Sequence, residues 1–340
     1  MEVWRVDPAD QAALAEWHAV LSASDEELWP GLGGYTRRDV TALARFEGST
    51  RRFELLAAGP EPSGPMLGVG LMELPERDNR HAAEITVAVH PEHRRRGVAT
   101  AIVEGMGAMA ADDGRRALNG IVDVPVAVAA SHASRHFAPR LGFEATMAGN
   151  SRHLHLPADR VRLDELRRVV ATARDAGDYR TVTFEAPWPV ELVDDQCELL
   201  RVMSRDEPAG DGEREEEVWD AGRVAEHEAL RAARGTPKLV AVAEHLPTRR
   251  LVAASELLLT PGVPHRACQL ETVVHPEHRG HRLGLAVKLA NLDFLARRAP
   301  EVRVVTTGNA AVNAPMIAIN DLLGFEVAGV GSFWQKRLRP

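Results

Sequence analysis

The sequence predicts an α/β (α+β) protein made of two similar halves, each a mixed sheet with helices on its faces. The first observation is a repeated pentapeptide: VHPEH stands at 89–93 and again at 274–278, followed both times by arginines and a glycine. The second is LGFEA at 141–145 and LGFEV at 323–327, at nearly the same offset. The third is that an apolar, strand-like run precedes each pentapeptide and a helical pattern follows it. Matching markers in the same order indicate a duplication, with about 155 residues per copy.

The elements of the N-terminal copy follow from hydrophobic periodicity, with Gly and Pro between them. The predicted strands are 3–6, 53–58, 67–74, 83–89, 117–124 and one that starts at 144, and the predicted helices are 9–22, 36–46, one directly after the arginine loop and 132–141. Because a single strand–loop–helix unit stands among mainly consecutive strands, the pattern favours a mixed sheet.

The C-terminal copy repeats this order after an amphipathic connecting helix predicted at 161–177. Its predicted strands are 179–185, 238–244, 251–259, 268–274, 302–307 and 326–337, and its predicted helices are 191–204, 214–233, 283–297 and 314–323. We therefore expect an N-terminal domain at 1–157, the connecting helix within 158–177 and a C-terminal domain at 178–340.

Composition argues against several classes of protein. A formal net charge of −8 argues against a general nucleic-acid-binding protein, which would carry a basic face. Two cysteines cannot build a disulfide framework, and the N-terminus lacks the basic and apolar regions of a signal peptide. No apolar run is long enough to span a bilayer. We expect a cytoplasmic protein with no nucleic-acid or membrane partner.

The run after the first pentapeptide, RRRGVA (94–99), has the parts of an anion-binding site. A loop that leaves a strand and enters a helix presents unpaired backbone N–H groups and the positive end of the helix dipole. Small residues let a phosphate approach the backbone, and arginines add charge-assisted hydrogen bonds. Neither copy contains the GxxxxGK[ST] of a P-loop or the GxGxxG of a dinucleotide fold, so ATP and NAD are not expected.

The pattern V-x-P-x-x-[RQ]-x-x-G-x-[GA] between a strand and a helix resembles the acyl-CoA pyrophosphate loop of the GNAT superfamily of N-acetyltransferases, and LGF before the last strand is the family's usual ending. The tandem layout is similar to mycothiol synthase and related actinobacterial double-GNAT proteins. The resemblance implies two tandem GNAT domains with mostly antiparallel sheets, and acetyl-CoA as co-substrate. The residues that it implies for CoA binding in the N-terminal copy are Val87, Ala88, Val89, Arg94, Arg95, Arg96, Gly97, Val98, Ala99 and Thr100.

The C-terminal copy departs from this pattern. Arg282 stands where the N-terminal copy has Gly97. Two interpretations stay open: a decayed loop that no longer admits pyrophosphate, or a variant in which Arg282 turns outward or itself contacts phosphate. Asn313 favours a working site, because many family members have a pantetheine-binding Asn there; Ser131 is its N-terminal counterpart. The C-terminal residues that the resemblance implies for CoA binding are Val274, Arg279, Gly280, Arg282, Gly284 and Asn313.

Acyl transfer to an amine requires a general base, because an amine with a lysine-like pKa is almost wholly protonated at neutral pH. In the N-terminal copy the candidate is Glu84, on the strand before the loop, where the family often places a catalytic Glu. Its aligned counterpart is Gln269, which cannot act as a base. Glu271 lies two residues later, so we expect it on the same face as Gln269 and treat it as the candidate base of the second site. A backbone N–H near Val87 or Val273 would stabilise the oxyanion.

The sequence does not reveal a general acid. The family often has a Tyr four residues before the Gly of LGF, and that position is Ala138 in one copy and Asn320 in the other. Either the thiolate leaves without direct protonation or another group serves. Cys268 is interpreted as a small buried residue rather than as an acyl-carrying nucleophile. His90 and His93 are interpreted as part of a strand-ending turn, so no metal is expected.

These observations predict an acyltransferase (N-acetyltransferase) that transfers acetyl from acetyl-CoA to a small-molecule primary amine by direct attack. The N-terminal copy is the better candidate for binding acetyl-CoA, through the backbone of 87–89 and the loop 94–100. Two alternatives stay open: the N-terminal copy holds CoA structurally and the C-terminal copy is catalytic, as the resemblance to mycothiol synthase implies, or the chain is a non-catalytic acyl-CoA sensor or scaffold. The acceptor is not determined, because the loops that surround it vary freely on one fold. Both a monomer and a homodimer are compatible with the sequence.

Overall fold

The computed structural model describes residues 1–62, 64–208 and 210–338. The helices are α1 (Gln11–Leu28), α2 (Arg37–Ala44), α3 (Val98–Asp112), α4 (Ser134–Arg140), α5 (Arg160–Ala171), α6 (Val193–Asp206), α7 (Ala221–Arg234), α8 (Leu283–Arg298) and α9 (Ala314–Leu323). The strands are β1 (Glu2–Arg5), β2 (Arg51–Gly59), β3 (Gly68–Pro75), β4 (Ala82–Val89), β5 (Ala117–Pro125), β6 (Glu144–His155), β7 (Tyr179–Glu185), β8 (Lys238–His245), β9 (Arg250–Leu259), β10 (Arg266–Val274), β11 (Val304–Ala310) and β12 (Glu326–Arg337). None of the described helices is long and apolar enough to cross a membrane.

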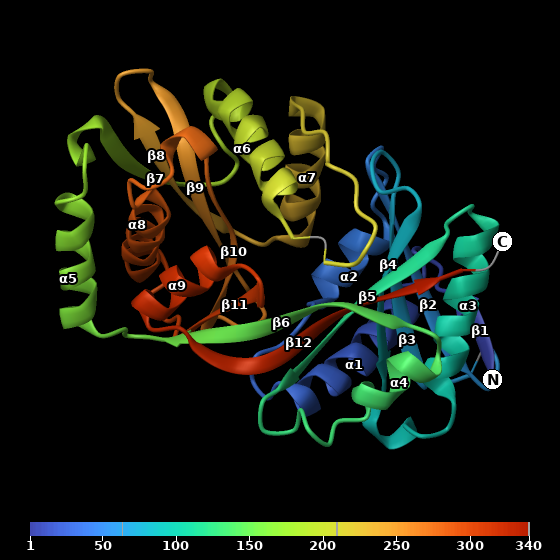
Figure 1. Ribbon diagram of the computed structural model, residues 1–340. Helices are drawn as coiled ribbons and strands as arrows, with labels where there is room; N and C mark the ends of the chain where they lie inside the picture. The colour runs from blue at the N-terminus through green and yellow to red at the C-terminus, as the bar shows by residue number, and fades with distance from the viewer. Residues whose placement is uncertain (63, 209, 339–340) are drawn as a thin grey trace.

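One continuous sheet runs through both halves of the molecule. Its strand order is β1-β2-β3-β4-β5-β12-β6-β11-β10-β9-β8-β7, which is symmetric when each strand is exchanged for its counterpart in the other copy. The pairs β4–β5 and β10–β11 are parallel, and the other pairs are antiparallel. The mixed, mostly antiparallel sheet predicted for each half is therefore confirmed, with helices on both faces (Figure 1).

The two halves exchange their last strands. Strand β12 belongs to the C-terminal copy, yet it pairs with β5 of the N-terminal copy along Gly329–Arg337. Strand β6 pairs in the same way with β11 of the C-terminal copy, and β6 and β12 pair with each other where the two lobes meet (Figure 1). The middle strands of the sheet thus bind each half to the other.

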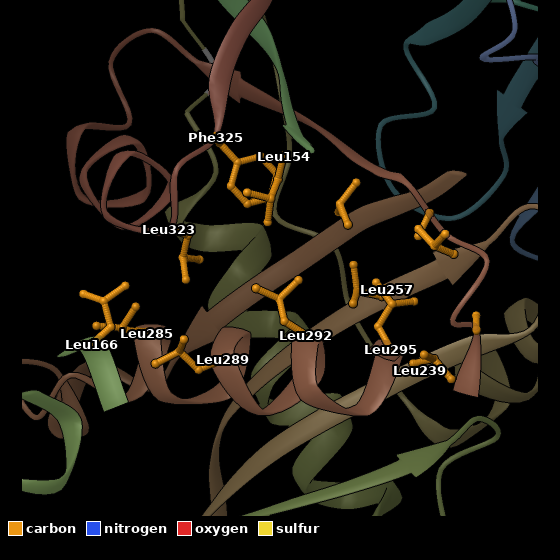
Figure 2. Close-up of a cluster of buried hydrophobic side chains, with 14 residues drawn as sticks. Leu154, Leu166, Leu239, Leu257, Leu285, Leu289, Leu292, Leu295, Leu323 and Phe325 are labelled. Atoms are coloured by element: carbon orange, nitrogen blue, oxygen red, sulfur yellow. The ribbon is translucent and has the colours of Figure 1, made fainter. Parts of the chain in front are cut away.

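The core of the C-terminal half rests on an apolar face of α8. Leu285, Leu289, Leu292 and Leu295 recur every three or four residues, so they project from one side of the helix toward β8 and β9 (Figure 2). Leu154 of the exchanged strand β6 joins this cluster and lies beside Phe325 (Figure 2). The N-terminal copy therefore supplies part of the C-terminal core.

Leu154→Ala is expected to lower the free energy of unfolding by about 2–5 kcal/mol, because the side chain is buried and its removal leaves a cavity. Denaturant titration of the full chain would measure this loss. Leu322→Ala is the matched control, since 47% of the Leu322 surface is exposed, and it should change stability by less than about 0.5 kcal/mol. Equal effects of the two substitutions would contradict the packing of β6 into the C-terminal core.

Three predicted helices differ from the observed ones at their ends. The helix expected at 9–22 continues to Leu28 as α1. The helix expected at 214–233 begins only at Ala221, where the Asp220 carboxylate caps it by accepting a hydrogen bond from the Arg223 backbone N–H. The preceding acidic stretch crosses to the N-terminal half instead of forming helix. The connecting helix ends at Ala171, and Asp175 then adopts a left-handed backbone conformation that a continuing helix does not allow.

Candidate active site

The parallel strands at the centre of each half separate after a short paired stretch. Strand β4 pairs with β5 only over Ala82–Ile85, and β10 pairs with β11 only over Arg266–Cys268. Beyond Ile85 and Cys268 the parallel pairing ends. From there on, one backbone edge of β4, and likewise one edge of β10, has no strand paired with it in the described residues. Such an edge can donate and accept hydrogen bonds to an extended ligand.

A cavity of about 1140 Å³ lies in the opening between β10 and β11. Its walls come from the loop before α8, from α8 and α9, and from the C-terminal end of α6, and its far side is built by β5 and β6 of the N-terminal copy. The structure brings the candidate base of this half and every residue that the resemblance implies for its CoA binding to the lining: Glu271, Val274, Arg279, Gly280, Arg282, Gly284 and Asn313. The sequence-based candidates of this half thus surround one space.

The two arginine loops have the same backbone path in spite of their different sequences. The left-handed positions are Arg95 and Gly97 in one copy and Gly280 and Arg282 in the other, so each copy has one glycine and one arginine there. A side-chain Cβ built at Gly97 would meet nothing within 4 Å, which explains why this position of the turn accepts an arginine. Arg282 is exposed and borders the cavity, and the turn into α8 is kept.

The first arginine of each loop ties the loop to the rest of its half. The Nε of Arg94 donates to the Val89 carbonyl at 3.4 Å, and its guanidinium pairs with Glu27 at 2.9 Å. Arg279 repeats this arrangement: its Nε donates to the last carbonyl of β10 at 3.2 Å, and its guanidinium pairs with Asp206. Both arginines therefore order the loops from which helices α3 and α8 begin.

The expectation that Gln269 and Glu271 share a face of β10 is wrong. The pairing of β10 with β9 shifts register between Gln269 and Thr272, so a bulge interrupts the alternation of side chains. The Gln269 amide donates to the Ser255 hydroxyl and to the backbone of β9, where it is buried. Glu271 instead interacts with Glu256 and Lys238. The bulge thus turns Glu271 toward the α6 side of the sheet.

Glu271 has the electrostatic environment of a proton acceptor. Burial, together with the negative charge of Glu256, raises the pKa of Glu271 to about 7. Glu256 is itself held by Lys238 at 3.0 Å and by the Trp188 indole N–H at 3.1 Å. A carboxylate that lines a cavity and has a pKa near neutrality can take a proton from an amine and release it to solvent.

Glu84 of the N-terminal half lies in a different setting. Its carboxylate accepts a hydrogen bond from the Asn119 amide at 2.8 Å, and desolvation by the surrounding protein raises its pKa although the side chain keeps contact with solvent. The acidic stretch between α6 and α7 crosses to this side, where the Asn79 backbone N–H donates to the Glu215 carboxylate at 2.7 Å. The positive charge of Arg214, in the same stretch, acts on Glu84 in the opposite direction and lowers its pKa. The C-terminal copy thus approaches the N-terminal candidate base.

Asp123 and Lys288 are charged residues that line the cavity and were not predicted from the sequence. Asp123 comes from β5 of the N-terminal copy; it accepts a hydrogen bond from Ser151 at 2.8 Å, and burial raises its pKa. Only the strand exchange brings it to the C-terminal cavity, so no local pattern could have indicated it. Lys288 is the other. It is the one charged residue inside the mostly apolar run LGLAVKLANL of α8, and this irregularity was a usable signal.

The second copy of the repeated pentapeptide also gathers possible metal ligands. One ligand atom each from His275, Glu277 and His278 lies within 4.8 Å of the others. The Tyr179 hydroxyl and His278 Nδ1 are 3.0 Å apart, so this histidine already takes part in a hydrogen bond. The three residues lie together on one turn at the end of β10, next to the loop that borders the cavity.

Comparison with known proteins agrees with this architecture. The family described as Acetyltransferase (GNAT) family matches residues 35–143, which lie in the N-terminal half. No protein of curated function matches the chain. Among solved structures, a tandem GNAT protein from the clavulanic acid biosynthesis pathway is 26% identical and has a TM-score of 0.80, with 100% of this chain and 99% of that chain covered.

Two more distant structures share the fold. A GCN5-related N-acetyltransferase from Sphaerobacter thermophilus is 15% identical with a TM-score of 0.64, and the match covers 99% of this chain and 96% of that chain. N-myristoyltransferase from Saccharomyces cerevisiae, solved with bound myristoyl-CoA and inhibitors, is 12% identical with a TM-score of 0.60 and coverage of 99% and 80%. The chain therefore has a tandem GNAT fold, and its residues 35–143 match the GNAT acetyltransferase family.

Proposed function

We propose that the chain is an acetyl-CoA-dependent N-acetyltransferase whose reaction takes place in the C-terminal half. The observation that carries this proposal is a single cavity that joins the arginine loop at the start of α8 to Glu271 on β10. One end offers the groups that bind phosphate, and the other offers a carboxylate with the pKa of a general base.

Acetyl-CoA would lie along the opening between β10 and β11. Its pyrophosphate would meet the backbone N–H groups at the start of α8 and the guanidinium of Arg282. The pantetheine arm would run beside the free edge of β10 near Val274. Asn313 accepts the Met316 backbone N–H at 3.3 Å through its Oδ1 and so caps α9, which leaves its amide N–H donors for the pantetheine.

Direct attack of the amine on the thioester fits the described groups. Glu271 would remove the proton of the attacking amine, the nitrogen would bond to the acetyl carbon, and the carbon–sulfur bond would break to release the CoA thiolate. An acyl-enzyme route through Cys268 is disfavoured, because burial raises the pKa of its thiol and so suppresses the nucleophilic thiolate.

The acceptor that suits this cavity is a small cationic amine. Asp123 and Glu207 line the cavity together with Glu271, and a site lined by carboxylates attracts a protonated amine. Glu271 would then convert the bound ammonium into the reactive amine. An anionic acceptor would be repelled by these carboxylates.

A second candidate site is the N-terminal half, with Glu84 as base. Two observations favour it: the family match falls on residues 35–143, and desolvation raises the pKa of Glu84. In this arrangement acetyl-CoA would bind to the backbone of 87–89 and to the residues around the start of α3, which are Arg95, Arg96, Gly97, Val98, Ala99 and Thr100. The two sites predict different responses to substitution of Glu84 and Glu271.

The proposal is tested by a screen of small amines for CoA release from acetyl-CoA, with calorimetry of CoA binding on the same protein. We expect micromolar to millimolar CoA affinity and thiol release with at least one cationic amine. Tight CoA binding with no release for any amine would instead support a non-catalytic acyl-CoA sensor. Absence of CoA binding would overturn both functions.

Arg282→Gly is expected to weaken CoA binding about tenfold, because one charge-assisted hydrogen bond to phosphate is lost. The free energy of unfolding should change by less than about 1–2 kcal/mol, since glycine relieves the left-handed conformation. Arg95→Gly is the matched control, because Arg95 is also a left-handed, exposed arginine but lies on the other loop. Unchanged CoA affinity in Arg282→Gly would favour a loop that no longer admits pyrophosphate.

A further inference from the structure

Lys288 is a buried cation without an acidic partner. It lies on α8 with 2% of its surface exposed, and it borders the inner wall of the cavity. Its ammonium donates to the Asn320 side-chain oxygen at 2.9 Å and lies 5.4 Å from the centre of the Phe325 ring. No carboxylate of the described residues forms an ion pair with it. A buried charge of this kind costs stability, so its presence calls for a functional explanation.

The fold itself does not require this charge. The same three positions in the N-terminal copy are apolar and form part of one hydrophobic cluster. The counterparts of Lys288, Asn320 and Phe325 are Val103, Ala138 and Phe143. The N-terminal half therefore packs well with valine and alanine at these two positions. The polar pair of Lys288 and Asn320 occurs in the C-terminal half, which contains the cavity.

The hydrogen-bonding partner of Lys288 is held in one orientation. The Asn320 amide N–H donates to the Asn309 side-chain oxygen at 2.7 Å, which leaves the Asn320 oxygen to face Lys288. Asn320 is fully buried, so this arrangement has little freedom. One N–H of the ammonium binds Asn320, and two further N–H groups remain on a side chain that borders the cavity.

We propose that Lys288 is the proton donor to the CoA thiolate, and that Asn320 positions it. This inference rests on the acetyltransferase function proposed above for the same cavity. As the carbon–sulfur bond of the tetrahedral intermediate breaks, the electron pair goes to sulfur and a proton passes from the Lys288 ammonium to it. CoA leaves as the thiol, and the neutral Lys288 amine regains a proton from solvent after product release.

The chemistry of the site agrees with this role. Burial lowers the pKa of Lys288 to about 7, so the ammonium is acidic enough to give up a proton at neutral pH and basic enough to regain one. Asn320 stands where the GNAT resemblance places a tyrosine, the position from which the family protonates the leaving group. The Lys288 ammonium, which comes from α8, lies beside Asn320 on α9 and so stands next to the position of that tyrosine.

The test uses the full chain with CoA itself as the probe and needs no acceptor. The thiol of bound CoA is titrated by its ultraviolet thiolate absorbance in the wild type, in Lys288→Met and in a control, Lys336→Met. Lys336 lies over Phe143, the counterpart of Phe325, so the control removes a lysine that stands over the equivalent ring of the N-terminal half. Desulfo-CoA binding checks that each variant keeps the rest of the site.

In the wild type below pH 7, where Lys288 keeps its charge, the ammonium should lower the thiol pKa of bound CoA, read from the thiolate absorbance, by about one unit or more relative to Lys288→Met. Lys336→Met should behave as the wild type, and Lys288→Met should bind desulfo-CoA normally and unfold at the same or a higher denaturant concentration. A thiol pKa that is equal in the wild type and in Lys288→Met would overturn the role of Lys288. Failure of the wild type to bind CoA would instead overturn the proposed function.

Turnover gives a second, independent readout. With an acceptor from the amine screen, Lys288→Met should lower kcat about 10²-fold and lose the decline of rate at high pH. Asn320→Asp should move that decline to higher pH, because an adjacent carboxylate stabilises the ammonium. An unaltered pH profile in both variants would show that Lys288 is structural.

Discussion

Glu271→Gln is expected to lower kcat/KM for amine acetylation by about 10²–10⁴-fold while CoA affinity stays unchanged. Glutamine keeps the size and the hydrogen-bonding capacity of the side chain but cannot accept the proton of the attacking amine. The substitution also removes a buried carboxylate that lies close to Glu256, so the free energy of unfolding should not fall. Steady-state kinetics and calorimetric CoA binding measure the two effects separately.

The pH dependence of the wild type follows from the same carboxylate. Because the pKa of Glu271 is raised to about 7, its basic form is scarce below this value, and kcat/KM should rise with pH up to about 7. Glu271 acts as a base only when it is deprotonated, so lowering the pH below about 7 should lower kcat/KM. The acid limb should disappear in Glu271→Gln.

Glu84→Gln is the matched control for this experiment, since Glu84 is the equivalent candidate of the other half. We expect it to retain activity within a few-fold of the wild type. Loss of turnover in Glu84→Gln with full activity in Glu271→Gln would move the reaction to the N-terminal half. Full activity in both variants would contradict a glutamate general base.

Separating the two halves is expected to abolish folding of each. A fragment of residues 1–157 lacks β12, so β5 loses the strand with which it pairs along Gly329–Arg337, and β6 loses both neighbours. A fragment of residues 178–340 lacks β6, so β11 loses its antiparallel partner, and the core loses Leu154. Because a native domain is stable by only about 5–15 kcal/mol, we expect the loss of these central strands to leave neither fragment folded.

Circular dichroism and denaturant titration of the two fragments, alone and mixed, would measure this dependence. We expect no cooperative unfolding of either fragment alone and a regained transition when 1–157 is co-expressed with 158–340, because the pair restores every strand of the sheet. The intact chain should unfold in a single transition. A folded, cooperative fragment of either half on its own would contradict a structural role for the exchange.

The exchange also has a consequence for the site. Asp123 and Ser151 lie on β5 and β6 of the N-terminal copy, yet they line the C-terminal cavity. A C-terminal half that folded without its partner would lack these groups and have an open cavity wall. The N-terminal copy therefore contributes to the proposed site even where it performs no chemistry.

Most of the strands and helices could be predicted from local patterns in the sequence alone. Hydrophobic periodicity and turn residues placed nearly every strand and helix within a few residues of its observed bounds, because both signals act over short stretches of chain. The repeat of VHPEH and LGF indicated the duplication, and the loop before α3 was found as a candidate anion site. For the loop before α8 the sequence left open whether it still admits pyrophosphate. The helix predicted at 214–233 began too early, because the Asp220 cap outweighed the helix-forming carboxylates before it.

Tertiary structure alone decided what the sequence left open. The endings LGFEA and LGFEV are nearly identical, so neither strand β6 nor β12 carries a local signal for its neighbour, and the exchange is decided by packing of the whole sheet. The bulge that turns Glu271 away from Gln269 arises from pairing with β9, which lies outside the motif. The burial of Lys288 depends on helices and strands far apart in the chain. Motifs thus located the two candidate sites, whereas long-range contacts determined which side chains share the cavity.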